Sequence, residues 1–287
     1  MALTVAELIA EGIGCLKSAG IDDAEIAPRS ILQYLLKQTS SGLQVIIDKA
    51  VPEETAELYR KLVKKRCGHV PIQYILGEVE FYNVKLGIDR RAMIPRPETE
   101  ILVENTISIL NSFSNPYVLD IGTGSGNIAI AIASNVDNVK IKAVDISDEA
   151  LNLAVENARL NDVLDDIEFI QDDCLRERFW EEVGRFDVIV SNPPYVDAGD
   201  FDKLQPEIKL YEPKIALITP GNPLLFFKAI AQHGRCALDV NGAICCEVGI
   251  GQALKVSEIL KKYLGDVDLK IVKDLTGIER VIICRLI

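Results

Sequence analysis

A strand followed by two prolines is the part of this sequence whose residue types point most directly to chemistry. Residues 185–190 alternate and then run apolar, as expected of a buried parallel strand, and Ser191-Asn192-Pro193-Pro194-Tyr195 follows. Neither proline can donate to a β-ladder, and a residue before proline is restricted to extended backbone. We therefore expect Asn192 at the carboxyl end of a strand, where ligands bind in open α/β sheets.

Asn192 and Pro193 offer two hydrogen-bond acceptors beside an aromatic ring. The Asn192 side chain has a carbonyl oxygen and an NH₂, Pro193 has a carbonyl but no N–H, and Tyr195 supplies a flat ring. This combination suits a planar NH₂-bearing group, such as a side-chain amide or an adenine ring. Asn-Pro and Pro-Pro are also common turn dipeptides, so the segment alone is equally consistent with a plain loop.

A glycine loop and two acids follow other strands of the same pattern. Gly122-Thr123-Gly124-Ser125-Gly126 comes after the expected buried strand 118–121, and its glycines let the backbone approach a ligand. Asp145 ends the next strand, where a carboxylate can accept from ribose hydroxyls or simply cap a helix. Asp173-Cys174 follows the third strand, where an acid can accept from an adenine amino group or lie in a surface turn.

The elements that position these residues alternate between strand and helix from Tyr117 onward. This order predicts a mainly parallel sheet with helices on both faces. The expected strands are 118–121, 141–144, 167–170, 185–190, 243–248, 267–273 and 279–286. The expected helices run from Pro97 or Glu98 to 110, over 128–134, from the cap Ser147, over 224–238 and over 252–263, with a long polar segment at 197–222.

The first part of the chain has a different pattern, of short helices up to about residue 68. Thr4 is the expected cap of the first helix, Asp22 or Asp23 of the second, and Glu53-Glu54 open another. Residues 70–92 then change to alternating apolar positions with a turn at Asn83, which indicates a β-ribbon joining two domains.

Composition bounds the possible classes of protein. The chain has 287 residues, of which 48% are hydrophobic and 26% charged, as in ordinary soluble globular proteins of one or two domains. No apolar run approaches the ~18 residues of a membrane helix. The start of the chain enters an amphipathic pattern without a basic region, so we expect no signal peptide. Seven cysteines without C-x-x-C favour free thiols in a reducing cytoplasm.

Charge and histidine content weigh against several activities. Residues 1–90 carry 11 Lys and Arg against 12 Asp and Glu, whereas residues 91–287 carry 20 against 31. The acidic part contains the Asn-Pro-Pro-Tyr segment, which weakens a DNA-binding interpretation, because duplex binding requires neutralised phosphates. The two histidines, His69 and His233, have no metal-ligand or nucleophile-elbow spacing, so we expect neither a metal site nor a Ser-His-Asp triad.

In combination, these motifs resemble class I S-adenosylmethionine-dependent methyltransferases that act on an amide or adenine nitrogen. Further segments narrow the resemblance to the bacterial peptide chain release factor N5-glutamine methyltransferase family, over nearly the full length. They are Pro71–Gly77, Phe81-Tyr82, Ile94–Glu100, Tyr211–Pro213, Glu247–Gly249 and Gly277–Arg280, with Ile94–Glu100 and the Asn-Pro-Pro-Tyr segment the most specific.

The resemblance implies a Rossmann-like, mainly parallel seven-stranded sheet with a small N-terminal helical domain joined by a β-hairpin. Residues 1–75 would be the helical substrate-recognition domain, 76–92 the hairpin and 93–287 the methyltransferase domain. It also implies a cytoplasmic enzyme, a monomer without direct DNA or membrane binding, whose protein partner is a class I release factor. The methyl acceptor would be side-chain N5 of the glutamine in a Gly-Gly-Gln motif.

The same resemblance assigns roles to individual residues. S-adenosylmethionine would bind to Gly122, Thr123, Gly124, Ser125, Gly126, Asp145, Asp173, Cys174 and Asn192. Asn192, Pro193 and Tyr195 would be catalytic, and they would contact the substrate together with Pro194, Met93 and Ile94. Cys174 stands where an aromatic residue is common in the family, which implies weaker stacking on the adenine.

Three other functions compete with this interpretation. A nucleic-acid adenine N6-methyltransferase could use the same acceptor pair on a flipped base, but would need a basic groove and a target-recognition domain, and neither is evident. A non-enzymatic adaptor with this fold would not need the intact glycine loop, Asp145 and Asn192. A nicotinamide dehydrogenase is disfavoured because the loop reads GxGxG and not GxGxxG.

Overall fold

The computed structural model describes residues 3–219 and 221–287, which divide into two compact units. The helical unit contains the chain up to Gly77 together with Gln205–Tyr211. The sheet unit contains Glu78–Leu204 and Glu212–Ile287. Met1 and Ala2, at the start considered above for a signal peptide, lie outside the described residues. None of the helices in the described ranges has the length and apolar character needed to cross a membrane.

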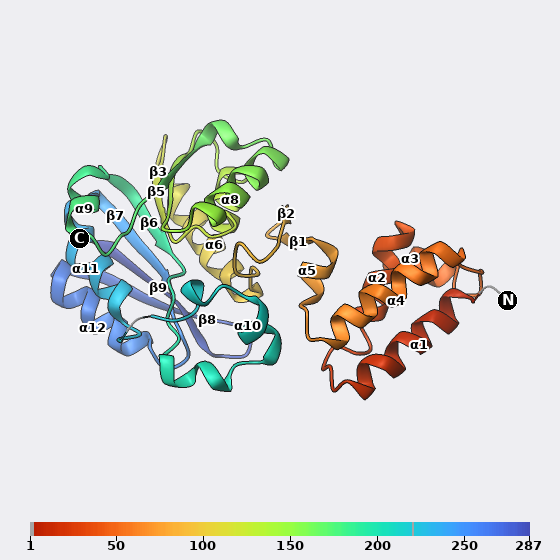
Figure 1. Ribbon diagram of the computed structural model, residues 1–287. Coiled ribbons are helices and arrows are strands. Elements are labelled where there is room, and N and C mark those ends of the chain that lie inside the picture. The colour runs from red at the N-terminus through yellow and green to blue at the C-terminus, as the bar shows by residue number, and fades with distance from the viewer. Residues whose placement is uncertain (1–2, 220) are drawn as a thin grey trace. The chain divides into compact units, whose positions relative to one another are not determined.

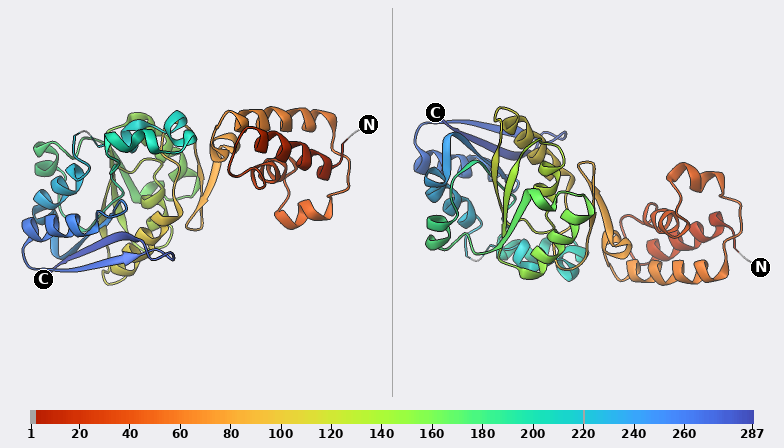
Figure 2. Two further views of the ribbon diagram at one scale, coloured as in Figure 1. Left: turned by 90° about the horizontal axis from the view of Figure 1, so that it is seen from below. Right: turned by 90° about the horizontal axis from the view of Figure 1, so that it is seen from above.

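The helical unit is built from short helices around its own apolar core, and the part of it up to Gly77 is coloured red to orange in Figure 2. Its helices are α1 (Val5–Ser18), α2 (Ala27–Leu36), α3 (Ser40–Val45), α4 (Glu53–Cys67), α5 (Ile72–Leu76) and α10 (Pro206–Tyr211). The predicted cap of α1 is confirmed, because the Glu7 N–H donates to Thr4 Oγ1 over 3.2 Å and the Thr4 N–H donates back to the Glu7 carboxylate.

Two predictions about this unit are wrong. Neither Asp22 nor Asp23 caps the second helix, whose N-cap is Ile26 without a side-chain bond; Asp23 instead accepts from Arg66 Nε over 3.0 Å. Residues 72–76, assigned above to a β-ribbon, form helix α5, which ends at Gly77 with a positive φ of 78°. At Asp23 the tertiary contact with Arg66 outweighs the local capping signal. At residues 72–76 the glycine cap ends a helix where the local pattern indicated a strand.

Helix α10 belongs to the helical unit although it lies far along the chain. Arg66, which is 2% exposed, donates through Nη2 to Glu207 Oε1 over 3.2 Å, and the Tyr211 hydroxyl donates to the Gly68 carbonyl over 2.7 Å. The long polar segment predicted at 197–222 therefore contains a helix, along with short 3₁₀ helices at Ala198–Lys203 and Lys214–Ala216.

The sheet unit contains a seven-stranded sheet in the order β5-β4-β3-β6-β7-β9-β8, so the predicted fold class is confirmed. The first five strands of this order pair in parallel, and β9 runs antiparallel to both neighbours, as the blue strands of Figure 2 show. The strands are β3 (Tyr117–Ile121), β4 (Lys140–Asp145), β5 (Ile167–Gln171), β6 (Phe186–Ser191), β7 (Leu238–Glu247), β8 (Val267–Lys273) and β9 (Glu279–Leu286).

Helices cover both faces of this sheet (Figure 1). Helices α6 (Pro97–Leu110), α7 (Asn127–Ala133) and α8 (Asp148–Leu160) share one apolar core with it. Helices α9 (Glu177–Glu182), α11 (Leu225–Ala237) and α12 (Ala253–Leu264) share the other. A hairpin of β1 (Glu78–Phe81) and β2 (Val84–Gly87) turns at Asn83 as predicted and packs Phe81, Val84 and Leu86 into the first of these cores.

The strand order reverses direction between β3 and β6. The chain moves from β3 outward through β4 and β5 and then returns to β6 on the other side of β3. Such a switch point leaves a crevice at the carboxyl ends of the two strands, where ligands bind in open α/β sheets. The glycine loop follows β3 and Asn192 follows β6, so the fold brings both to this crevice.

Candidate active site

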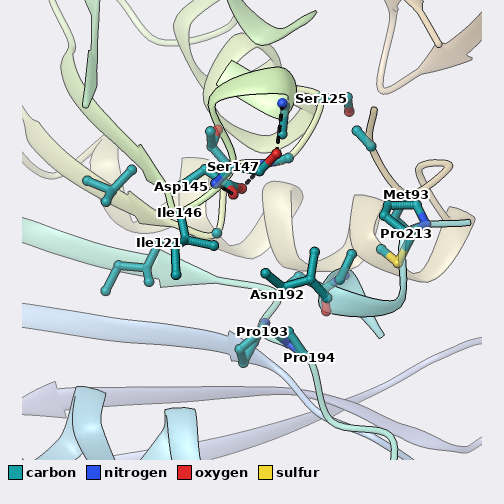
Figure 3. A pocket seen from close by; sticks show the side chains of 18 of the residues that line it. Met93, Ile121, Ser125, Asp145, Ile146, Ser147, Asn192, Pro193, Pro194 and Pro213 are labelled. Atoms are coloured by element: carbon teal, nitrogen blue, oxygen red, sulfur yellow. Dashed lines mark hydrogen bonds between the residues drawn. The ribbon is translucent and has the colours of Figure 1, made fainter. Parts of the chain in front are cut away.

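A pocket of about 550 Å³ opens at the carboxyl ends of the parallel strands, and all its lining residues belong to the sheet unit. A volume of this size is typical of cofactor and substrate sites. Most of the predicted site residues line it: Met93, Gly122, Thr123, Gly124, Ser125, Asp145, Asp173, Cys174, Asn192, Pro193 and Pro194. Figure 3 shows Met93 and Pro213 across the pocket from Asp145, with Asn192 between them.

The glycine loop is held by backbone hydrogen bonds to the neighbouring strand. The N–H groups of Gly122 and Thr123 both donate to the Val144 carbonyl, over 2.8 and 3.0 Å. Gly126, which is not among the described lining residues, has φ +81°, and a Cβ there would lie 2.9 Å from Ile130 Cδ1. Gly126 therefore permits close packing of the loop against helices α7 and α8, whereas a Cβ on Gly122 would meet open space.

Asp145 ends β4 with its carboxylate turned toward the glycine loop. Its Oδ2 accepts from the Gly124 N–H over 2.8 Å and its Oδ1 from the Ser147 N–H over 2.9 Å. Burial raises the pKa of this carboxyl, while the two N–H donors oppose the shift. Each carboxylate oxygen keeps a second lone pair, so a bound hydroxyl or amino group can still donate to Asp145.

Two buried polar atoms beside the loop lack partners among the described residues. Asp120 is fully buried, receives the Thr123 hydroxyl on Oδ2 over 2.7 Å and has no donor on Oδ1. Burial raises its pKa to about 7. Ser125 Oγ, in the pocket wall, is also without a partner. Because an unsatisfied buried polar atom is costly, Ser125 Oγ marks a place where a bound molecule would complete the hydrogen bonding, whereas Asp120 is not among the lining residues.

The segment after β5 supplies an acid and a small apolar group. Asp173 Oδ1 accepts from the Leu175 N–H over 2.9 Å, and the Cys174 carbonyl accepts from Trp180 Nε1 over 2.7 Å. Burial raises the pKa of the Cys174 thiol to about 12, so it stays a neutral thiol. Cys174 therefore presents an apolar surface to the pocket, which the exposed side chain of Ile146 also lines.

Asn192 is fixed by the ends of two strands and by helix α6. The Ser191 hydroxyl donates to the Ile121 carbonyl over 2.8 Å, which joins the end of β6 to the end of β3. The Asn192 NH₂ donates to Thr99 Oγ1 over 3.2 Å. These bonds leave the side-chain oxygen of Asn192 as the acceptor available to the pocket.

Two predicted substrate residues do not line this pocket. The ring of Tyr195 packs into the apolar core shared with α11 and α12, and its hydroxyl donates to Glu247 Oε1 over 3.3 Å. Ile94 is 3% exposed, and its N–H donates to Glu212 Oε2 over 3.3 Å. Their contacts with substrate remain predictions.

Other residues of the pocket were not foreseen from the sequence. Pro213, Lys214, Ile215, Ala216 and Phe226 line it, from the segment after α10 and from α11. Thr99 and Glu247 lie behind Asn192, and both stand inside motifs that carried the family resemblance, Ile94–Glu100 and Glu247–Gly249. Motif membership was therefore the one available signal, and it did not say what these two side chains contact.

Comparison with known proteins identifies the same family. The model of the Methyltransferase small domain matches residues 98–208, and that of the PrmC N-terminal domain matches residues 7–77. A release factor glutamine methyltransferase of Clostridium botulinum is 36% identical over 279 residues, covering 97% of this chain and 98% of the relative. Another, of Thermodesulfovibrio yellowstonii, is 40% identical over 237 residues, covering 82% of this chain and 83% of the relative.

A solved structure supports the fold independently. The hMettl16 catalytic domain, in complex with MAT2A 3′UTR hairpin 1, is 14% identical with a TM-score of 0.58, covering 91% of this chain and 90% of that one. At this identity the likeness concerns the fold alone. Identity above 30% over nearly the whole length of the Clostridium relative carries the family assignment. The chain belongs to the release factor glutamine methyltransferase family.

Proposed function

We propose that this protein transfers a methyl group from S-adenosylmethionine to side-chain N5 of the glutamine in the Gly-Gly-Gln motif of class I peptide chain release factors. One observation carries the proposal most strongly. The acceptor pair of Asn192 and Pro193 and the carboxylate of Asp145 line the same pocket, in a chain that aligns over nearly its full length with release factor glutamine methyltransferases. Such a pocket offers a place for an amide nitrogen next to a place for an adenosine.

The residues on the glycine-loop side fit S-adenosylmethionine. Asp145 keeps acceptor capacity for ribose hydroxyls, and Asp173 for an amino group of the adenine. Ser125 Oγ, which lines the pocket and has no partner among the described residues, can serve the polar methionine end. Acidic surroundings suit a cofactor with a positive sulfonium better than one with a pyrophosphate. When bound, the cofactor supplies an electrophilic methyl group.

The substrate side would orient and activate a weak nucleophile. An amide nitrogen attacks poorly because its lone pair is delocalised into the carbonyl. Asn192 Oδ1 and the Pro193 carbonyl would accept its two hydrogens, aim its lone pair at the methyl carbon and stabilise the positive charge that develops on nitrogen. Transfer would break the bond between the methyl carbon and the cofactor sulfur as the carbon–nitrogen bond forms, and the nitrogen would then release one proton. Met93, Pro194 and Pro213 would exclude water from these contacts.

We further propose that the helical unit provides part of the docking surface for the release factor. Its α4 carries Lys61, Lys64 and Lys65 exposed, while the sheet unit is acidic, so the two units offer a large partner surfaces of different charge. Because the acidic sheet unit would repel the phosphates of a nucleic acid, we expect the partner to be a protein. No second large domain of the kind that reads DNA sequence is present among the described residues.

The proposed function is tested by label transfer from S-adenosylmethionine to a class I release factor and, in parallel, to duplex DNA. We expect label on the release factor and none on DNA. A release factor whose Gly-Gly-Gln glutamine is replaced by asparagine should accept no label, because the shorter side chain leaves the amide about one methylene short, and such misplacement is costly. Label on DNA adenine would favour the nucleic-acid methyltransferase instead.

A further inference from the structure

A buried chain of hydrogen bonds connects Asn192 to a carboxylate behind the pocket wall. The Asn192 NH₂ donates to Thr99 Oγ1 over 3.2 Å, and the Thr99 hydroxyl donates to Glu247 Oε2 over 2.6 Å. Thr99 is 1% exposed and Glu247 is 2% exposed, so water does not compete for these bonds. Asn192 is part of the pocket lining, and the other two residues are not.

The register of the sheet explains why Asn192 and Glu247 lie at the same edge of the sheet. Strands β6 and β7 run parallel with Ser191 opposite Cys246, so the next residue of each strand comes at the same edge. Helix α6 packs against these strands and begins at Pro97, which places Thr99 in its first turn. Three separate elements thus deliver one side chain each to a single line of hydrogen bonds.

The chemistry of the hydroxyl fixes the direction of this line. A threonine hydroxyl has one proton, and its short bond to a carboxylate uses that proton. Thr99 Oγ1 can then only accept from Asn192, so the atom that faces it must be the NH₂ and not the carbonyl oxygen. The two ends of an asparagine amide have nearly the same shape, and only such a partner distinguishes them. With its proton donated to Glu247, Thr99 therefore holds the Asn192 NH₂ and turns the Asn192 oxygen toward the pocket.

Glu247 holds a second residue of the Asn-Pro-Pro-Tyr segment in the same way. Its Oε1 accepts from the Tyr195 hydroxyl over 3.3 Å, while Oε2 accepts from Thr99. One carboxylate thus receives the two hydroxyls that fix the segment at both ends. An uncharged group at this position could not accept from both with equal strength.

We propose that Thr99 and Glu247 are positioning residues, which hold the Asn192 amide with its oxygen toward the methyl-accepting nitrogen. This inference rests on the proposed function, because it assigns the residues that orient the proposed acceptor. Neither residue touches the substrate. Without them Asn192 would remain in the pocket wall but would present its NH₂ part of the time, which repels an incoming NH₂ group.

The charged groups around Glu247 are few. Glu98 on α6 and Arg280 on β9 act on it electrostatically; Arg280 lies 3.3 Å from Glu98 and also pairs with Asp274, over 2.9 Å. Burial raises the pKa of Glu247 above the ordinary 4.5, and the hydroxyls of Thr99 and Tyr195 oppose the shift. Protonation of Glu247 on acidification would leave one oxygen as a full acceptor, so the carboxyl could no longer receive both the Thr99 and the Tyr195 hydroxyls.

The test compares Thr99→Val, which keeps the shape and removes the hydroxyl, with Thr99→Ser, which keeps the hydroxyl. Thr106→Val is the matched control, because Thr106 is a fully buried threonine of the same helix whose hydroxyl donates over 2.7 Å to the Leu102 carbonyl and is not bonded to the Asn-Pro-Pro-Tyr segment. We expect Thr99→Val to lower kcat for release factor methylation about 10- to 100-fold, as is usual for residues that orient a catalytic group. Cofactor affinity by calorimetry should be unchanged, and Thr99→Ser should retain most of kcat.

Equal kcat in Thr99→Val and Thr106→Val would overturn the proposal, as would a failure of Thr99→Ser to rescue kcat. If wild-type enzyme methylates no release factor at all, the proposed function fails, which is a different result from either of these.

A pH profile gives a second test that does not depend on Thr99→Val folding. Glu247→Gln keeps a carbonyl acceptor for Thr99 but cannot ionise, so the acid limb of kcat should differ from wild type. Superimposable profiles would contradict the role of Glu247.

Discussion

The two walls of the pocket are built by different means. On the glycine-loop wall, backbone N–H groups hold the loop and the Asp145 carboxylate, and Gly126 supplies the space for packing. On the Asn192 wall, side chains hold side chains, from Asn192 through Thr99 to Glu247. The difference teaches where mutations should act: changes on the first wall should lower cofactor binding or stability, and changes on the second should lower turnover.

The largest expected effect is on turnover. Asn192→Ala should lower kcat about 10²- to 10³-fold, the usual loss for one preorganised polar group, because the substrate amide loses its side-chain acceptor. Cofactor affinity and the unfolding midpoint should stay near wild type. Steady-state kinetics with a release factor, together with calorimetric titration of the cofactor, measure both. An Asn192→Ala enzyme with full rate would show that the segment is only a turn.

Next in size is the contrast between two glycines of the loop, both with positive φ. Gly126→Ala should lower the free energy of unfolding by about 1 kcal/mol or more beyond the loss in Gly122→Ala, since its Cβ would press on Ile130 and Ala154. Gly122→Ala has open space around its Cβ and should mainly weaken cofactor binding. Urea unfolding and calorimetry separate these outcomes. Equal stability of the two variants would contradict the assignment of Gly126 to packing.

An effect of similar size, on cofactor affinity, is expected at Asp145. Asp145→Ala should weaken cofactor binding by roughly 10-fold or more, because charged hydrogen bonds to the ribose are lost. Turnover at saturating cofactor should fall far less than in Asn192→Ala. Calorimetric titration that finds unchanged affinity would remove Asp145 from the cofactor site.

The smallest effect concerns the reactivity of Cys174. Because burial raises its thiol pKa to about 12, iodoacetamide at mildly alkaline pH should leave it unmodified. The exposed free thiols of Cys15 and Cys236 serve as internal controls and should react. Peptide mapping after short labelling gives the result. Rapid labelling of Cys174 in the folded protein would show that this wall is open and polar.

The sequence allowed a good prediction of the sheet because its signals are local. Strands 267–273 and 279–286 coincide with β8 and β9, and the glycine loop and Asn192 each follow a predicted strand. Such residues are found by apolar runs and by turn chemistry, which act over a few positions. The mainly parallel order follows from the alternation of strands and helices.

What the sequence could not reveal depends on contacts between distant segments. Helix α10 is held in the helical unit by Arg66, which lies 141 positions away from Glu207. Thr99 and Glu247 are 148 positions apart and meet because α6 packs against β7. Tyr195 was predicted to contact the substrate, but its position after the end of a strand does not say which way its ring turns. Without tertiary structure, no periodicity indicates such pairs.

Site mapping by mass spectrometry tests the central claim most directly. A class I release factor is incubated with the enzyme and S-adenosylmethionine, digested and sequenced by fragmentation. The account predicts the mass of one methyl group on the glutamine of the Gly-Gly-Gln peptide and on no other residue, and its absence with Asn192→Ala under the same conditions. A methyl group on another residue, or a release factor left unmodified by folded wild-type enzyme that binds the cofactor, would contradict it.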